Sequence, residues 1–207
     1  MATTFYLIRH GETEWNHQRR IVGQGDPALN ETGRRQAAVA AEWLAGLRLD
    51  IIYTSDLSRA RKTAEIVGSR QAGADIRSDR RLREKDAGTR TGWGYEEARL
   101  ASPEYDAAMR RDPLHTRPEG GESVADQLAR VVEALDELAV RHAGQAVGIV
   151  THGGALRCAV MHAMKLTMEQ VYQLDFDNCS LTVIEWGERP RVVAVNSVSD
   201  AARYQQG

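Results

Sequence analysis

The sequence predicts an α/β fold of three layers, in which a mostly parallel central sheet carries helices on both faces. Short apolar runs alternate along the chain with segments whose apolar residues recur at helical spacing. The run 146–150 (AVGIV) is continuously apolar, which is typical of a strand buried on both faces. Such alternation favours parallel strands joined by helices, and ligands of these sheets bind at the carboxyl ends of the strands.

Residues 5–8 (FYLI) begin the chain as a short buried strand, because four apolar side chains stand in a row. A helix follows, and Asn30 or Thr32 can accept hydrogen bonds as its capping residue. Residues 49–54 then form the second strand. The apolar residues of the helix between these strands recur at helical spacing: Ala37, Ala40, Ala41, Leu44 and Leu47.

The next helix follows Ser55 or Asp56, either of which can cap it. Its apolar stripe consists of Leu57, Ala60, Ala64 and Val67. Arg59 lies in the first turn, where the helix dipole disfavours a cation but attracts an anion. We therefore expect Arg59 to bind an anion. Residues 75–77 form a short edge strand, which leads to Glu84.

The segment between Gly88 and Pro118 is polar and interrupted by glycine and proline, so its conformation is the least regular. We expect two short helices there, at residues 95–100 and 104–111. They belong to an irregular helical insertion, about residues 88–120, that covers one end of the sheet and the active site, since loops in such places commonly carry function.

The last part of the chain holds the clearest helix. Ser123 and Asp126 form its capping box, and it ends near Gly144. The buried strand 146–150 follows and leads through His152 into another apolar helix. The chain closes with two strands and a polar end: residues 181–186 and 191–195 as a hairpin, and residues 201–207 as a frayed tail.

Composition excludes several classes of protein. With 29 acidic and 27 basic residues among 207, the chain has no overall field that favours nucleic acid or a membrane surface. No segment is apolar enough to span a bilayer, and no leader precedes the first strand. Cys158 and Cys179 fall in a helix and at the start of a strand, which favours free buried thiols over a disulfide framework. We therefore expect a reducing, cytoplasmic location.

Side chains that suit a phosphoryl group follow four predicted strands. Arg9 and His10 follow the first strand, Arg59 the second, Glu84 the edge strand and His152 the buried strand. Since strand ends of this kind meet at one edge, these side chains can share one crevice. Two arginines and a second histidine around a nucleophilic imidazole can surround a tetrahedral dianion. Protonated Glu84 can then give a proton to the leaving alcohol, and as a carboxylate it can take one from water.

Five motifs, in order between about Phe5 and Trp186, closely resemble the histidine phosphatase superfamily, the phosphoglycerate mutase-like proteins. They are RHGETEWN at 9–16, YTSDLSRA at 53–60, LRE at 82–84, PEGGES at 118–123 and THGG at 151–154. The resemblance implies a phosphoglycerate mutase-like fold and a single histidine phosphatase domain over residues 1–207. It assigns nucleophilic phosphohistidine chemistry to His10, proton donation to Glu84 and phosphate binding to Arg9, Arg59 and His152. It further implies that no metal or other cofactor takes part and that four more residues line the phosphate site: Thr13, Asn16, Gly23 and Gly153.

Within this family the sequence favours a phosphatase. The segment 23–30 (GQGDPALN) resembles the phosphatase members, and the long inserts typical of mutases are missing. Thr91, however, stands where small phosphatases usually carry a glutamate, whereas Lys85-Asp86-Ala87 replaces the Arg-His-Tyr run of the mutases. We expect a hydrolase of a small-molecule phosphomonoester, with cofactor-dependent phosphoglycerate mutase-type transfer as the alternative. Lys85 and Arg90 are candidates for binding a second anionic group.

Two other classes stay open at this stage. A non-catalytic phosphate-binding module would keep the pocket but lose the nucleophile or the acid, both of which are present. A metallohydrolase is electrostatically awkward, since arginines would flank the metal and no close ligand pair exists. Its ligands would be His10, His152, Asp26 and Glu84. We expect a structural role for Arg157 inside its helix, and His17 and His115 can reach substrate from loops. The sequence does not identify the substrate, and it does not decide whether the protein forms a homodimer.

Overall fold

The computed structural model describes residues 2–199, and its six strands form one sheet in the order β3-β2-β4-β1-β5-β6. The strands are β1 (Thr3–Arg9), β2 (Ile51–Thr54), β3 (Asp75–Ser78), β4 (Ala146–Thr151), β5 (Leu181–Trp186) and β6 (Arg191–Ser197). The four strands β3, β2, β4 and β1 are parallel, whereas β5 and β6 are antiparallel neighbours. The predicted mostly parallel sheet is confirmed. The predicted frayed tail, 201–207, lies outside the described residues.

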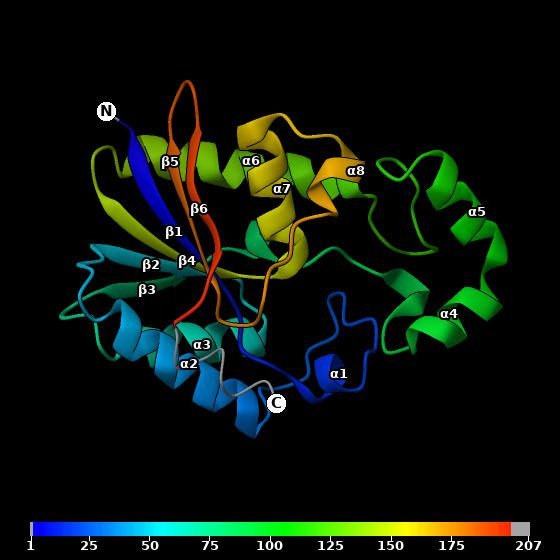
Figure 1. Cartoon of the computed structure of the whole chain (residues 1–207), viewed down its shortest axis with the longest axis horizontal. Coiled ribbons are helices and arrows are strands. Elements are labelled where there is room, and N and C mark those ends of the chain that lie inside the picture. Colours follow the sequence, from blue (N-terminus) through cyan, green and yellow to red (C-terminus); the bar gives the residue numbers. More distant parts are fainter. Residues whose placement is uncertain (1, 200–207) are drawn as a thin grey trace.

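Helices cover both faces of this sheet (Figure 1). One face carries α2 (Glu31–Leu44) and α3 (Ser58–Gly68), and the other carries α6 (Val124–Arg141) and α7 (Gly153–Met164). Successive side chains of a strand point to opposite faces. Leu7 therefore packs into the core under α6 and α7, while Ile8 packs with Leu44 of α2 and Ala60 of α3. The prediction of three layers is confirmed.

The helix starts agree only in part with the predictions. Asn30 caps α2, since its side chain accepts a hydrogen bond from the Gly33 amide, but Leu47 lies beyond the end of that helix. For α3 the prediction is wrong, because neither Ser55 nor Asp56 is the capping residue. The N-cap is Leu57, which has no capping side chain.

Asp26 provides the missing acceptor for α3 from a distant loop. Its Oδ1 accepts hydrogen bonds from the Ser58 amide at 2.7 Å and the Ser58 hydroxyl at 2.8 Å. Asp56 instead accepts two hydrogen bonds from the Arg83 guanidinium. The two hydrogen bonds of Asp26 therefore hold the loop before α2 against the start of α3.

The irregular middle of the chain contains both of the short helices expected there. They are α4 (Tyr95–Ala101) and α5 (Pro103–Arg111), and they lie together at one end of the molecule, away from α2 and α3 (Figure 1). The remaining helical segments are α1 (Glu14–His17), α8 (Met168–Val171) and two 3-10 turns at Arg80–Leu82 and Gly88–Arg90. No helix within residues 2–199 is both long and apolar enough to cross a membrane.

Candidate active site

The ends of β1 and β4 lie at one cavity of about 380 Å³, whose walls include Arg9 and His10 from the end of β1 and Gly153 after β4, while His152 is buried behind the wall. Arg9 and Thr151 pair across these two strands, so His10 and His152 emerge side by side. The rings of the two histidines are 5.0 Å apart between centroids and meet edge to face. The cavity walls include seven of the residues predicted to form the site: Arg9, His10, Asn16, Gly23, Arg59, Glu84 and Gly153.

His10 is almost completely buried and held in one orientation. Its Nδ1 lies 2.7 Å from the Gly11 carbonyl oxygen, which can only accept, so Nδ1 carries the proton. Its Nε2 accepts a hydrogen bond from Arg59 Nε at 3.2 Å. The unprotonated nitrogen of His10 is therefore Nε2, which lies beside a cation in the cavity.

Burial keeps both histidines neutral. It is the main cause that lowers the pKa of His10 well below its usual value, and Arg59 and Arg9 add to the effect. The pKa of His152 is lowered in the same way by burial, then by Arg59 and His10. Neutral His10 retains its lone pair at neutral and mildly acidic pH. The two ring nitrogens of His152 have no hydrogen-bond partner within residues 2–199.

Arg59 is fully buried, and hydrogen bonds fix its guanidinium to the loop before α2. Nη1 and Nη2 donate to the carbonyl oxygens of Gly25 and Gly23, at 2.6 and 2.9 Å. Burial lowers the pKa of Arg59 to about 10, so the side chain is still a cation at neutral pH. Gly23 has a φ of +50°, and a Cβ there would lie 2.8 Å from the Cβ of Ala87. Only glycine suits this position.

Arg9 is the second cation of the cavity. One of its terminal nitrogens donates to the Phe176 carbonyl, whereas its buried Nε has no partner among the described residues. Burial lowers the pKa of Arg9, and the Glu84 carboxylate opposes this effect. A buried donor without a partner is costly, so an anion in the cavity would gain a hydrogen bond there.

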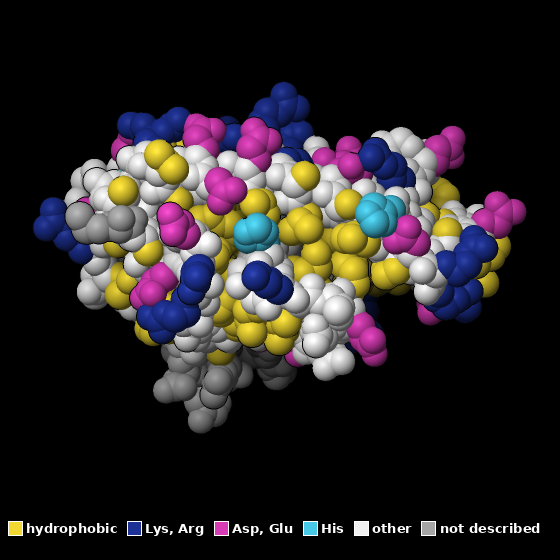
Figure 2. Space-filling model, turned by 90° about the horizontal axis from the view of Figure 1, so that it is seen from above, with side chains coloured by type: hydrophobic (Ala, Val, Ile, Leu, Met, Phe, Trp, Pro, Cys, Tyr) yellow, Lys and Arg dark blue, Asp and Glu magenta, His cyan; other side chains and the backbone are white. Residues whose placement is uncertain are grey.

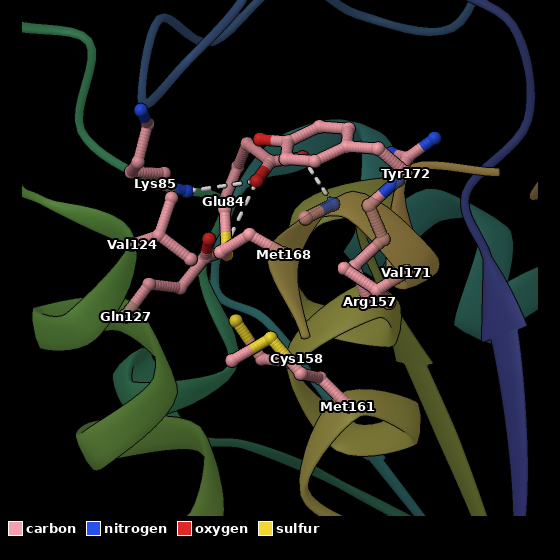
Figure 3. A pocket seen from close by; sticks show the side chains of 11 residues that line it. Glu84, Lys85, Val124, Gln127, Arg157, Cys158, Met161, Met168, Val171 and Tyr172 are labelled. Carbon is pink, nitrogen blue, oxygen red and sulfur yellow. Dashed lines mark hydrogen bonds between the residues drawn. The ribbon is translucent and has the colours of Figure 1, made fainter. Parts of the chain in front are cut away.

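Three donors hold the carboxylate of Glu84 (Figure 3). Its Oε1 accepts from the Lys85 amide at 2.8 Å and from Gln127 Nε2 at 3.0 Å, while its Oε2 accepts from the Gly154 amide at 3.0 Å. A Cβ at Gly154 would lie 2.0 Å from Oε1, so a side chain at this position would displace the carboxylate. The first turn of α7 therefore requires glycine to seat Glu84.

Thr13 and Asn16 have different places. Asn16 lines the cavity, whereas Thr13 is fully buried and caps α1. The Oδ1 of Asn16 accepts hydrogen bonds from the amide and the hydroxyl of Thr13, at 3.1 and 3.0 Å. Thr13 thus supports the conformation of Asn16 and does not itself line the cavity.

Two residues at the site were not singled out as functional from the sequence. Arg157, for which we expected a structural role, lines the cavity and also lies over the rings of Tyr172 and Phe176. It follows Gly153 by four residues, and this helical spacing was the available signal. Gln127, which donates to Glu84 without lining this cavity, gave no such local signal, because only packing of α6 brings it beside Glu84.

The other candidate residues divide into two groups. Lys85 lines the cavity, as its predicted role requires. Arg90 does not, because it pairs with Asp106 and stacks on Tyr105. His17 and His115 are exposed and do not line the cavity; His115 bonds to Asp112 instead.

The arrangement offers no support for the metallohydrolase alternative. In the described part of the chain, no group of three or more histidine, cysteine, aspartate or glutamate side chains could hold a metal ion. Asp26, one of the ligands considered, is committed to Ser58. What the cavity does offer is a neutral imidazole nitrogen, two guanidinium groups and a fixed carboxylate, which together suit phosphoryl transfer.

The chain is similar to known proteins over most of its length. The family model of the histidine phosphatase superfamily (branch 1) matches residues 5–198. Phosphoglycerate mutase-like protein 4 of Arabidopsis thaliana is 36% identical over 193 residues, which cover 88% of this chain and 84% of the relative. Probable phosphoglycerate mutase GpmB of Cronobacter sakazakii is 36% identical over 190 residues, covering 89% and 86%.

Solved structures are similar over nearly their whole length. YhfR of Bacillus stearothermophilus has a TM-score of 0.88 at 35% identity and covers 96% of this chain and 98% of its own. The mycobacterial glucosyl-3-phosphoglycerate phosphatase Rv2419c in complex with VO3 has a TM-score of 0.84 at 33% identity, covering 94% and 98%. These matches confirm the fold and family that the five motifs predicted: the chain belongs to the histidine phosphatase superfamily, branch 1.

Proposed function

We propose that the protein hydrolyses small-molecule phosphomonoesters through a phosphohistidine formed on His10. The observation that carries this proposal is the state of His10, a buried neutral imidazole whose Nδ1 is held by a carbonyl and whose Nε2 lies beside Arg59. A nucleophile needs an unprotonated nitrogen, and a phosphoryl group needs cations around its oxygens. The cavity supplies both.

The reaction follows two displacements. In the first, Nε2 of His10 forms a bond to phosphorus as the bond from phosphorus to the alcohol oxygen breaks, and Glu84 gives its proton to that oxygen. In the second, Glu84 takes a proton from water, whose oxygen bonds to phosphorus as the bond to Nε2 breaks. Arg9, Arg59 and His152 bind the phosphoryl oxygens throughout. Phosphate leaves, and no metal ion is required.

Phosphoglycerate mutase-type transfer is the second candidate. It is favoured by Lys85 and Arg157, which add cations to the cavity wall beyond the phosphate pocket and suit a second phosphate or a carboxylate. Hydrolysis is favoured by the rest of the segment after Glu84. Asp86 is turned away to bond with the Gly88 amide, and Ala87 presents only a methyl group to the cavity.

Phosphate release from a panel of phosphomonoesters tests the proposal. The panel includes 3-phosphoglycerate, contains a chelator throughout and compares the wild type with His10→Ala. Chelator-resistant release that His10→Ala abolishes supports hydrolysis. Isomerisation of 3-phosphoglycerate without net release supports the mutase, whereas release that survives the substitution contradicts both.

The proposed setting is a reducing one, in the cytoplasm. Cys158 and Cys179 are buried and unpaired, as predicted. Burial raises the pKa of each thiol to about 12, so both are unreactive as nucleophiles. Such thiols suit a compartment in which cysteines stay reduced.

A further inference from the structure

A second cavity of about 170 Å³ adjoins the phosphate cavity (Figure 3). It lies between α6, α7 and α8, and the two cavities share four wall residues: Glu84, Lys85, Gly154 and Arg157. The carboxylate of Glu84 therefore faces both spaces. The mechanism proposed above uses only the first of them.

The rest of the second cavity is mainly apolar. Its walls are formed by Val124, Cys158, Met161, Met168, Val171 and Tyr172, with Gln127 beside Glu84. Cys158 behaves as a small apolar group, because its buried thiol stays protonated. Methionine side chains are flexible and adapt to ligands of different shape.

The same apolar character continues to the surface. Seen from above, hydrophobic side chains gather across the middle of the face that α6, α7 and α8 form (Figure 2). Tyr172, which lines the cavity, is itself about half exposed, at 53%, so the cavity wall reaches the surface. An apolar surface beside a cavity commonly marks a binding site.

The position of Glu84 connects this cavity with the reaction. To give its proton, Glu84 must touch the oxygen of the leaving alcohol. The carbon attached to that oxygen then starts where the two cavities meet. A leaving group that turns past Glu84 enters walls of valine, methionine and a tyrosine ring, where burial of apolar area is favourable.

We infer that this second cavity binds an apolar part of the leaving alcohol, so that the enzyme prefers phosphomonoesters of aryl-substituted or longer alkyl alcohols to those of short alcohols such as ethanol. A cavity of about 150 Å³ holds benzene, so the space here is large enough for a group of that size, which would lie against the apolar walls, opposite Glu84, Lys85 and Arg157. The inference rests on the proposed hydrolysis through His10 and adds the substrate class. Val171 of α8 is only 2% exposed and lines the cavity, so a larger side chain at this position would fill the space.

The test compares ethyl phosphate with 2-phenylethyl phosphate. Both release a primary alcohol of similar reactivity, so a difference in kcat/KM reports binding of the phenyl group. The wild type is expected to prefer the phenylethyl ester by about tenfold or more. Val171→Phe fills the cavity and is expected to bring the ratio close to one. Val193→Phe, on the half-exposed side of β6, is the matched control and is expected to keep the ratio of the wild type.

A second variant keeps the test decisive if Val171→Phe fails to fold. Met168→Ala enlarges the cavity, and we expect it to gain activity on 2-(1-naphthyl)ethyl phosphate relative to the phenylethyl ester. A ratio near one in the wild type, a ratio unchanged in Val171→Phe, or no gain in Met168→Ala overturns the inference. If one of these results is found and His10→Ala still abolishes phosphate release, the inference fails but the proposed hydrolysis stands. If phosphate release survives in His10→Ala, the proposed function itself fails.

Discussion

Glu84 receives its three hydrogen bonds from three separate parts of the chain: the following residue, α6 and the first turn of α7. This arrangement holds the carboxylate in the cavity wall, beside the position that we propose for the leaving alcohol. If Glu84 is the general acid, its contribution to the rate depends on how strongly the leaving group needs a proton. An alkoxide leaves poorly without a proton, whereas 4-nitrophenolate leaves readily.

Glu84→Gln is therefore expected to affect the two kinds of ester differently. For ethyl phosphate, kcat/KM should fall about 100-fold or more, as is common when a general acid is lost. For 4-nitrophenyl phosphate the loss of kcat/KM should be much smaller. Steady-state kinetics on both esters measures this. Equal losses would show that Glu84 does not protonate the leaving group.

Gln127 is a positioning residue, since it is buried and donates to Glu84 without lining the phosphate cavity. Gln127→Leu keeps its bulk but removes the donor, so we expect kcat/KM on alkyl esters to fall by about tenfold. The kcat/KM on 4-nitrophenyl phosphate should change little, because its leaving group needs no proton. Gln173→Leu, at an exposed position, provides the control. A uniform loss on both esters, or a lower melting temperature that accounts for it, would contradict the positioning role.

At the scale of elements, the start of α3 depends on the loop before α2. Asp26 accepts two hydrogen bonds from Ser58, and the carbonyls of Gly23 and Gly25 accept from Arg59. This loop thereby fixes the direction of the Arg59 guanidinium. The same contacts join two helices that cover one face of the sheet (Figure 1).

Removal of the Asp26 side chain, which caps α3, should lower both the stability of the fold and the affinity for phosphate. Asp26→Ala is expected to lower the free energy of unfolding by about 1 kcal/mol, as for other lost caps. It should also weaken inhibition by inorganic phosphate, because Arg59 loses its support. Chemical denaturation and inhibition kinetics measure the two effects. Asp75→Ala, on the exposed edge strand β3, is the control. Equal losses of stability and of phosphate inhibition in this control would contradict the roles of Asp26 as the cap of α3 and as a support of Arg59.

The capping residues also show how far sequence alone can predict these elements. Asn30 was predictable because it lies within one turn of the amide that it caps. Asp26 was not, because it lies 32 residues before Ser58 and reaches it only in the folded chain. Gln127 was equally unpredictable as a residue of the site, because it lies 43 residues after Glu84 in the sequence. Strand ends predict that Arg9, His10 and His152 come together, but the direction of a helical side chain toward a cavity depends on packing between helices.

At the scale of the whole molecule, two buried neutral histidines make folding sensitive to acid. The pKa values of His10 and His152 are lowered in the folded state, whereas an unfolded histidine has a pKa of about 6.5. Below that pH the unfolded chain binds protons that the folded chain does not. The free energy of unfolding must therefore fall as the pH drops below about 6.5.

We expect each of the two histidines to contribute up to about 1.4 kcal/mol per pH unit in this range. Urea denaturation between pH 7.5 and 5.2 measures the slope, above the range in which carboxylates titrate. His10→Asn should remove part of the slope, whereas His162→Gln, at an exposed position, should leave it unchanged. A stability that is flat over this range would contradict the burial of two neutral histidines.

Attack by His10 on phosphorus would form a phosphoenzyme, and direct capture of this intermediate tests the proposed function. Enzyme mixed with a ³²P-labelled phosphomonoester in the presence of a chelator is quenched within milliseconds in alkali, which preserves phosphohistidine, and digested for peptide mapping. We expect label on the peptide that holds His10, stable in alkali and lost in acid, and none in His10→Ala. Rapid turnover with no label on His10, or label on another residue, would contradict the proposed function.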